Sequence, residues 1–403
     1  MSDKNLPKPI KSISISTSVE QPCNSPKTTE RLSLPQAQAL KTIVKSEDES
    51  WIDRLYAWAD KNYLPDLFWG HNCGGTDMYY GLPRNREKLK TLSKLYIPYG
   101  KVIDDDYDEP FFTKLTELPV EIGQLKQLTE LDLSNNQITT LPEEIRLLAL
   151  LIQLDLSCNQ LIELPAEIGH LEQLTKLDLS HNLRLTYLPA EIGQLVQLSE
   201  LDLSYNQIAK LPEEIGLLVQ LKQLNLRCNQ IINFPKEIGK FTQLAQLNLS
   251  LNQLTELPAE TGQLTQLTQL DLSHNQLTKL PAEIGQLTQL TQLDLSHNQL
   301  TELPAEIGQL TQLTELNLSC NKLTDLPVEI GQLAQLTELN VSGNKTAKLP
   351  VEIAELTQLS KFILPSNTLE PPVESFDLID NSLFMGKISI RKIYRHKNQQ
   401  KTR

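Results

Sequence analysis

Residues 280–300 read LPAEIGQLTQLTQLDLSHNQL. Residues 257–277 read LPAETGQLTQLTQLDLSHNQL, and residues 303–323 read LPAEIGQLTQLTELNLSCNKL. The three segments begin 23 residues apart and differ at only a few positions. A period between about 20 and 50 residues is typical of a solenoid, in which each unit packs only on its neighbours.

One asparagine marks this period along most of the chain. Its spacing is 23 residues, except for one step of 24 where a residue is added between Asn182 and Pro189. Leucines precede it in the order L-x-x-L-x-L-x-x-N, as in residues 290–298. The asparagines of this ladder are Asn136, Asn159, Asn182, Asn206, Asn229, Asn252, Asn275, Asn298, Asn321, Asn344 and Asn367.

The spacing within one period predicts a short strand and a return segment. Leu293 and Leu295 flank one residue, so both point to one side of a strand while Asp294 points to the other. The asparagine amide can bond the turn backbone of its own and the neighbouring unit. The return segment PAEIGQLTQL brings Ile284 and Leu287 back to the same interior. We therefore expect eleven regular parallel strands and a degenerate one near residues 94–97.

These roles predict an order of stability effects. Truncation of Leu293 to alanine should cost about 2–5 kcal/mol, because it opens a cavity. Truncation of Asn298 should also be severe, because it leaves buried backbone groups without partners. Truncation of Asp294, on the predicted solvent side, should cost no more than about 0.5 kcal/mol.

The chain divides into four predicted regions. Residues 1–48 are rich in Ser, Pro, Thr and Lys and are expected to be disordered. Residues 49–110 are expected to form an N-terminal helical cap, a degenerate first repeat and an acidic loop; the cap helix would place Ile52, Leu55, Tyr56 and Ala59 on one face. The acidic loop lacks EF-hand spacing, which favours a solvated loop over a calcium site. Residues 111–370 form the array of eleven repeats, and residues 371–403 a C-terminal cap and basic tail.

The repeated motif resembles that of the leucine-rich repeat superfamily. It is similar to the LPxEIGxLxxLxxLxLxxNxL type, found in bacterial repeat proteins and in Ras-group and plant disease-resistance-like repeats. The resemblance covers about residues 82–369. It implies an α/β solenoid, a horseshoe whose parallel sheet lines the concave face and presents that face to a partner protein.

Composition narrows the compartment and the partner. The net charge is −13, which argues against broad contact with nucleic-acid phosphates. Residues 381–403 differ, with seven Lys or Arg and no acidic residue, so this tail could contact an anionic surface. The sequence has no run of 18 apolar residues, so we expect no transmembrane helix. It also has no apolar stretch near its start, so we expect no signal peptide. Five scattered cysteines fit a reducing cytosol, so we expect a cytoplasmic protein, with non-classical export as an alternative.

The motifs of enzymes and cofactor sites are missing from the sequence. The nearest match to a phosphate-binding loop, Gly386-Lys387-Ile388, lacks the hydroxyl residue after lysine. His274, His297 and Cys320 share one position in three consecutive repeats, a possible zinc set. The same position also holds Asn135, His181, Tyr205, Leu251 and Gly343, which indicates a position that tolerates almost any residue. We therefore expect no metal, no cofactor and no enzymatic activity.

The predicted function is protein binding on the concave face. Exposed columns of Asp or Asn and of Ser are expected to form a regular polar rim. An irregular patch of Tyr205, Lys222, Arg227 and Leu251 interrupts them, and Tyr and Arg are frequent among residues that dominate binding energy. Two alternatives stay open: a bacterial effector exported to bind a host protein, and a membrane-surface adaptor acting through the basic tail.

Overall fold

The computed structural model describes residues 49–71, 77–99, 113–346 and 349–364. Nearly all of these belong to one compact unit, Trp51–Arg403. Several predictions lie outside the described residues: the disordered segment 1–48, the acidic loop at 104–109, Asn367, and the C-terminal cap and basic tail.

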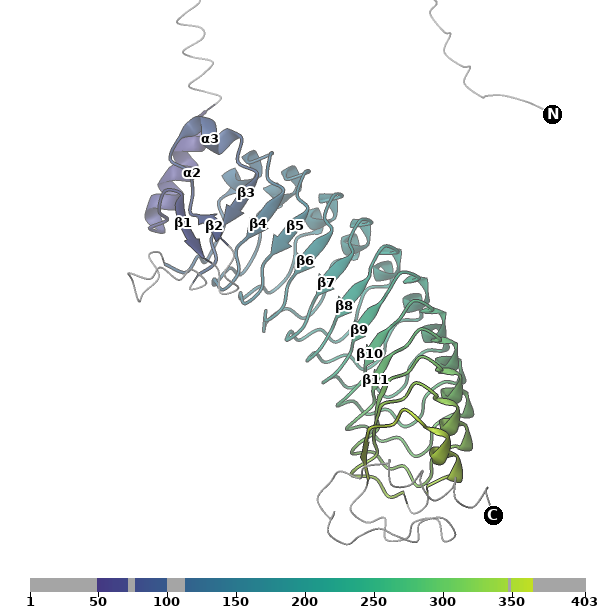
Figure 1. The fold of residues 1–403 in the computed structure, drawn as a ribbon. Helices are drawn as coiled ribbons and strands as arrows, with labels where there is room; N and C mark the ends of the chain where they lie inside the picture. The colour runs from purple at the N-terminus through teal and green to yellow at the C-terminus, as the bar shows by residue number, and fades with distance from the viewer. Residues whose placement is uncertain (1–48, 72–76, 100–112, 347–348, 365–403) are drawn as a thin grey trace, which may run out of the picture. The chain divides into compact units, whose positions relative to one another are not determined.

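The described repeats form one open parallel sheet, as the period predicts (Figure 1). Twelve strands of the described chain follow each other in sequence order, and each pairs with the next through the same register, as Leu293 does with Leu270 and Leu316. The strands are β3 (Lys94–Tyr96), β4 (Glu130–Asp132), β5 (Gln153–Asp155), β6 (Lys176–Asp178), β7 (Glu200–Asp202), β8 (Gln223–Asn225), β9 (Gln246–Asn248), β10 (Gln269–Asp271), β11 (Gln292–Asp294), β12 (Glu315–Asn317), β13 (Glu338–Asn340) and β14 (Lys361–Ile363).

Each return segment forms one 3₁₀ turn on the side of the array opposite the strands (Figure 1). Proline precedes each turn and presets its entry dihedral, as Pro281 does with φ −68°. Glycine allows the close stacking of successive turns, because a Cβ on Gly285 would lie 2.6 Å from the Glu306 carbonyl oxygen. The turns are η1 (Val120–Gln124), η2 (Glu143–Leu147), η3 (Ala166–His170), η4 (Ala190–Gln194), η5 (Glu213–Leu217), η6 (Lys236–Lys240), η7 (Ala259–Gln263), η8 (Ala282–Gln286), η9 (Ala305–Gln309), η10 (Val328–Gln332) and η11 (Val351–Glu355).

The core is a continuous column of leucine and isoleucine between the strands and the turns. Leu293 and Leu295 enter it from β11, and Ile284 and Leu287 from the return segment, and all four are fully buried. The residue added between Asn182 and Pro189 is absorbed in the loop, where Leu183 is exposed. The strands β6 and β7 on either side keep their register, Leu177 opposite Leu201.

The N-terminal cap is a helix followed by a hairpin and a degenerate repeat. Helix α2 (Ser50–Lys61) buries Ile52, Leu55, Trp58 and Ala59 against the core. Tyr56 is half-buried and packs against the same core, as the sequence predicts, and Trp58 is a further buried residue of this helix. Strands β1 (Phe68–His71) and β2 (Asp77–Tyr80) pair antiparallel, and α3 (Arg86–Lys90) precedes β3.

Candidate functional site

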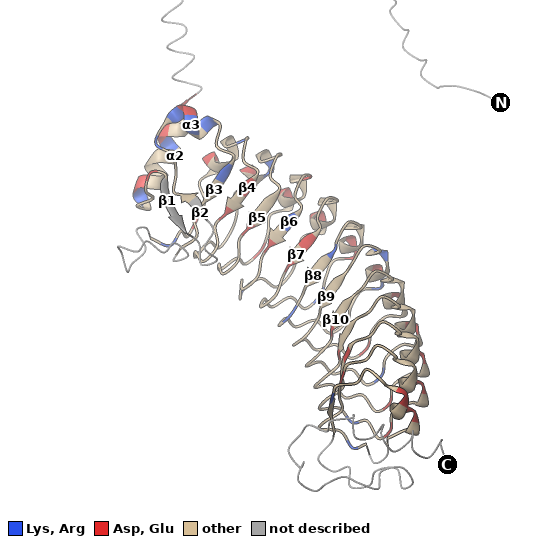
Figure 2. Cartoon of the chain, viewed as in Figure 1, with Lys and Arg blue, Asp and Glu red and all other residues tan. Residues whose placement is uncertain are grey.

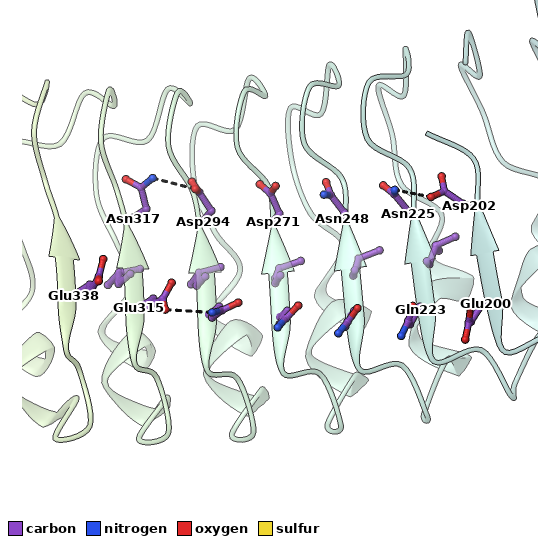
Figure 3. Close-up of a pocket in the computed structure, with 18 of the residues that line it drawn as sticks. Glu200, Asp202, Gln223, Asn225, Asn248, Asp271, Asp294, Glu315, Asn317 and Glu338 are labelled. Carbon is purple, nitrogen blue, oxygen red and sulfur yellow. Dashed lines mark hydrogen bonds between the residues drawn. The ribbon is translucent and has the colours of Figure 1, made fainter. Parts of the chain in front are cut away.

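The strand face is hollowed into a trough, called here the groove. It has a volume of about 660 Å³ and extends across strands β6 to β14. Residues at all three positions of strands β6 to β13 line it, together with Lys361 and Ile363 of β14, and the turns lie behind the sheet (Figure 3). A trough this long and shallow suits an extended macromolecular surface rather than a drug-sized ligand, which pockets enclose on most sides.

The first row along the strand face consists of the third residue of strands β4 to β13, called here the Asx row. In each of these ten repeats the Oδ1 atom accepts a hydrogen bond from the backbone N–H two residues later, at 2.8–3.2 Å. That N–H lies where the strand ends, so the side chain supplies a partner at the turn. The members are Asp132, Asp155, Asp178, Asp202, Asn225, Asn248, Asp271, Asp294, Asn317 and Asn340.

The second row, the serine row, lies two residues further on. The prediction that these serines are exposed is wrong: Ser296 is 5% exposed and Ser134 fully buried. In six repeats the serine hydroxyl donates to the Asx row, as Ser134 Oγ does to Asp132 Oδ1 at 2.6 Å. These serines therefore complete the turns of their repeats instead of forming the rim of a binding surface.

Four consecutive aspartates, from Asp132 to Asp202, place like charges on adjacent strands. The structure raises the pKa of Asp178 above its ordinary value of 3.8. Burial is the largest cause, and the neighbouring carboxylates of Asp155 and Asp202 add to it, while hydrogen bonds from Ser180 oppose it. The strand face thus holds more negative charge than its own groups neutralise.

Arg227 replaces serine in the serine row and makes a different set of contacts. Its Nε donates to Tyr205 Oη at 3.2 Å and its Nη1 to Ser250 Oγ at 3.0 Å. The guanidinium lies 6.0 Å from the centroid of the Tyr205 ring. The hydrogen bond with Tyr205 raises the pKa of Arg227 further above its ordinary value. The Tyr205 ring in turn stacks on His181, with 4.2 Å between ring centroids.

The structure brings together only part of the patch that the sequence suggests. Tyr205 and Arg227 are in contact, but Lys222 is exposed at the other end of strand β8. Lys222 and Arg227 are five residue steps apart along a near-extended chain, which is ~16 Å at the rise of a strand. Leu251 is half-buried and occupies the position of Tyr205 two repeats further along.

The position of Tyr205 has a left-handed backbone in the ten repeats from Asn135 to Gly343. The φ angles lie between 54° and 59° for the non-glycine residues and reach 68° for Gly343. The interpretation that this position tolerates almost any residue is therefore wrong, because a Cβ disfavours this region and a branched Cβ is worst. The sequence carried a weak signal of this: the position contains Asn135 and Gly343 but no Val, Ile or Thr.

Two members of this column, His274 and His297, stack face to face, with 4.1 Å between ring centroids and 8° between planes. In the described ranges, no group of three or more His, Cys, Asp or Glu is arranged to hold a metal ion. Cys158, Cys228 and Cys320 are not joined in disulfides within the described residues. Among the helices that the structure describes, none is long and apolar enough to cross a membrane.

Solved structures with the same architecture include proteins of bacteria and plants. A leucine-rich repeat protein of Leptospira interrogans is 38% identical, with a TM-score of 0.56, and the match covers 76% of this chain and 86% of that one. The plant peptide hormone receptor RGFR1, solved in complex with RGF2, is 30% identical with a TM-score of 0.53, over 69% of this chain and 48% of that one. The functional domain of InlJ from Listeria monocytogenes is 27% identical with a TM-score of 0.53, over 69% of this chain and 64% of that one.

Family models agree with the structural matches. A leucine-rich repeat model matches residues 126–183, 150–208, 288–346 and 311–369. Models of a leucine-rich repeat region and of a single repeat match residues 182–276 and 266–287. No curated protein sequence gives a significant match. The chain belongs to the leucine-rich repeat family.

Proposed function

We propose that this chain is a non-enzymatic scaffold that binds another protein on the strand face along the groove, with Arg227 and Tyr205, just beyond the ends of strands β8 and β7, as the anchor. The observation that carries the proposal is that the charge of Arg227 has no ion-pair partner among the described residues. Arg227 is a cation on an acidic strand face, and its hydrogen bonds go to the neutral groups of Tyr205 and Ser250. Within the described residues it forms no ion pair, so its charge is available to a carboxylate of the partner.

The residues of the Asx row next to Arg227 are uncharged, so they do not neutralise the charge of its guanidinium group. The Asx row holds amides at Asn225 and Asn248, where most other repeats hold aspartate. Asn225 Oδ1 accepts from the Arg227 backbone N–H, as an aspartate would, without adding a negative charge. A guanidinium has five N–H donors, and Tyr205 and Ser250 take two of them. The remaining donors are enough for a bidentate bond with a carboxylate.

Tyr205 holds the anchor in place before any partner arrives. Its ring lies between the imidazole of His181 and the guanidinium of Arg227. Stacking on one side and a hydrogen bond on the other restrict the rotamers of both side chains. Ordering an Arg side chain before association lowers the entropy cost of binding, and this is why preorganised anchors dominate affinity.

The regular rows could not define the position of a partner by themselves. Strands β10 and β11 present the same residues to the groove, Gln, Leu and Asp, so a partner could shift by one repeat without loss. Arg227 occurs at one repeat only, which selects one register. Lys222 at the other end of β8 and Leu251 in the next repeat would contact the same partner, as a second cation and an apolar contact.

The remaining parts of the proposal rest on the family and on the composition. Leucine-rich repeats are protein-binding modules, and binding rather than catalysis is the role that this family supports. The five cysteines of the sequence are scattered and odd in number, which fits a reducing compartment, so we propose that the protein is cytoplasmic.

The test begins with an affinity pull-down of the full chain and mass spectrometry, which names the partner. Calorimetry then compares the unmodified chain with Arg227→Ser, a substitution that restores the residue found at this position in the other repeats. We expect Arg227→Ser to weaken binding about 30-fold, which corresponds to ~2 kcal/mol. Gln269→Ser, at an exposed groove position on β10, is the control and should change the Kd less than about twofold. If Arg227→Ser binds the partner as tightly as Gln269→Ser does, Arg227 is not the anchor and recognition lies elsewhere on the chain.

A further inference from the structure

The charges that line the groove are unbalanced. The residues lining it in the described part of the chain include two lysines and seven carboxylates. Figure 2 shows acidic residues on the strand face and on the turns. Both lysines are already paired, since Lys176 Nζ lies 3.2 Å from Glu200 and Lys361 Nζ 2.5 Å from Glu338.

The other five carboxylates receive hydrogen bonds from neutral groups only among the described contacts. Asp202 accepts from Ser204 and from Asn225 Nδ2 at 2.9 Å. Asp294 accepts from Ser296 and from Asn317 Nδ2 at 3.0 Å (Figure 3). The remaining three are Asp178, Asp271 and Glu315, with partners Ser180, Ser273 and Gln292. The unpaired charge runs from β6 to β12, along the middle of the groove.

The same chain contains a segment of the opposite sign. Between positions 387 and 403 it has no acidic residue and seven basic ones: Lys387, Arg391, Lys392, Arg395, Lys397, Lys401 and Arg403. We propose that residues 387–403 dock in the groove of their own chain, with their cations on the unpaired carboxylates of β6 to β12.

The chain length allows this placement. The last described residue, Leu364, follows β14, which forms one end of the groove. The groove runs over eight strand spacings, from β14 to β6, or ~38 Å at about 4.8 Å each. The 22 residues from 365 to 386 reach up to ~73 Å when extended, at about 3.3 Å per residue. Residues 387–403 would extend over a further ~55 Å, enough to lie along the whole groove.

Tethering makes such a contact effective even when each ion pair is weak. A segment on a linker of this length has an effective concentration in the millimolar range. The docked segment would compete with any partner for the same surface. The inference goes beyond the proposed function, because it needs no second protein and does not involve Arg227.

The first test is zero-length carbodiimide cross-linking of the full chain, followed by peptide mapping. We expect Lys387, Lys392, Lys397 and Lys401 to link to Asp202, Asp271, Asp294 and Glu315. The built-in control is the turn side, which offers Glu237, Glu260, Glu283 and Glu306 at similar spacing. Links spread over both sides, or absent from the groove, would overturn the proposal. A mixture of ¹⁵N-labelled and unlabelled chains identifies links between two copies, and a predominance of those would also overturn it.

The second test measures affinity, using a fluorescent peptide of residues 387–403 as the probe. The recipient is the full chain with all seven basic residues of the segment changed to glutamine. This recipient should bind the peptide at least tenfold more tightly than the unmodified chain does, because its own segment no longer occupies the groove. Equal binding by the two chains would overturn the proposal.

A matched pair of variants of the same recipient separates the groove from net charge. Changing Asp178, Asp202, Asp271 and Asp294 to asparagine should weaken peptide binding at least tenfold. These changes preserve the fold, because Asn225 and Asn248 already make the same backbone hydrogen bond. Changing Glu237, Glu260, Glu283 and Glu306 to glutamine removes the same charge from the turns and should change affinity less than twofold. Equal losses in both variants would show attraction by net charge alone. Because no partner is present, these results are independent of the Arg227 experiment.

Discussion

Asn298 joins its own repeat to the preceding one through Leu272. Its Nδ2 donates to the Leu272 carbonyl oxygen at 2.9 Å and to the Leu295 carbonyl oxygen at 3.1 Å, and its Oδ1 accepts from the Leu277 N–H at 3.0 Å. The same pattern recurs along the described ladder, from Asn136 to Asn344. One buried amide thus satisfies backbone groups of two adjacent repeats, where the turns leave them without ladder partners.

Replacing Asn298 with alanine should therefore destabilise the array severely. The variant leaves a buried N–H and two buried carbonyl groups unsatisfied, and we expect a loss of about 2–4 kcal/mol in the free energy of unfolding. Denaturant unfolding followed by circular dichroism measures the change. Gln276→Ala, an exposed position of the adjacent repeat, is the control and should lie within about 0.5 kcal/mol of the unmodified chain.

Leu293→Ala and Asp294→Ala test the two sides of one strand. Leu293 is 1% exposed, and its truncation should cost about 2–5 kcal/mol. The sequence suggested a negligible cost for Asp294→Ala, but Asp294 accepts from the Ser296 N–H at 2.8 Å, so we now expect about 1–2 kcal/mol. Asp294→Asn keeps this bond and should be nearly neutral. A loss for Asp294→Asn as large as that for alanine would show that the charge, not the hydrogen bond, stabilises the turn.

Thr261 is a local defect that the sequence itself shows how to repair. It lies in η7 at the position that isoleucine holds in the other turns, it is 1% exposed, and its hydroxyl has no hydrogen-bond partner among the described groups. Thr261→Ile should stabilise the chain by about 1–2 kcal/mol, because it replaces an unsatisfied buried hydroxyl with apolar packing. The reverse change one repeat along, Ile284→Thr, should destabilise by a similar or larger amount. A destabilised Thr261→Ile variant would mean that η7 has no room for the larger side chain.

Asp178 should lower stability at neutral pH. Its folded pKa is raised, mainly by burial, so the native state binds this proton more tightly than the unfolded state does. Its contribution to stability is therefore most favourable when it is protonated and is lost as the pH rises through its pKa values. Asp178→Asn should be more stable than the unmodified chain at pH 7, and the gap should close as the pH falls below about 4. A gap that stays constant from pH 7 to pH 3 would contradict the raised pKa of Asp178.

The period alone predicted the sheet, because each Leu-x-Leu segment has one buried side and each copy needs the next to cover its core. The same repeat pattern did not predict that the serine row is buried. A column of identical small polar residues looks like a solvent face, but the Asx row folds those hydroxyl groups inward, as in Ser134 with Asp132. The hairpin β1–β2 has no repeat to reveal it.

The candidate site was predictable in part. Arg227 stood out as an exception within a regular row, and its contact with Tyr205 follows from their neighbouring repeats. The separation of Lys222 from Arg227 was not predicted. Both residues belong to the same repeat, but they lie at opposite ends of strand β8. The left-handed backbone at Tyr205 could only have been inferred from the absence of branched residues in its column.

The most direct test of the central claim is steric. Once the pull-down has identified the partner, calorimetry compares two tryptophan variants of the full chain. Gln269→Trp places a bulky ring at an exposed position on the strand face, whereas Ala282→Trp places it at an exposed position of turn η8 behind the sheet. Binding in the groove predicts that Gln269→Trp weakens the partner at least tenfold while Ala282→Trp leaves the Kd within about twofold. The opposite pattern, loss with Ala282→Trp and full affinity with Gln269→Trp, would contradict recognition on the strand face.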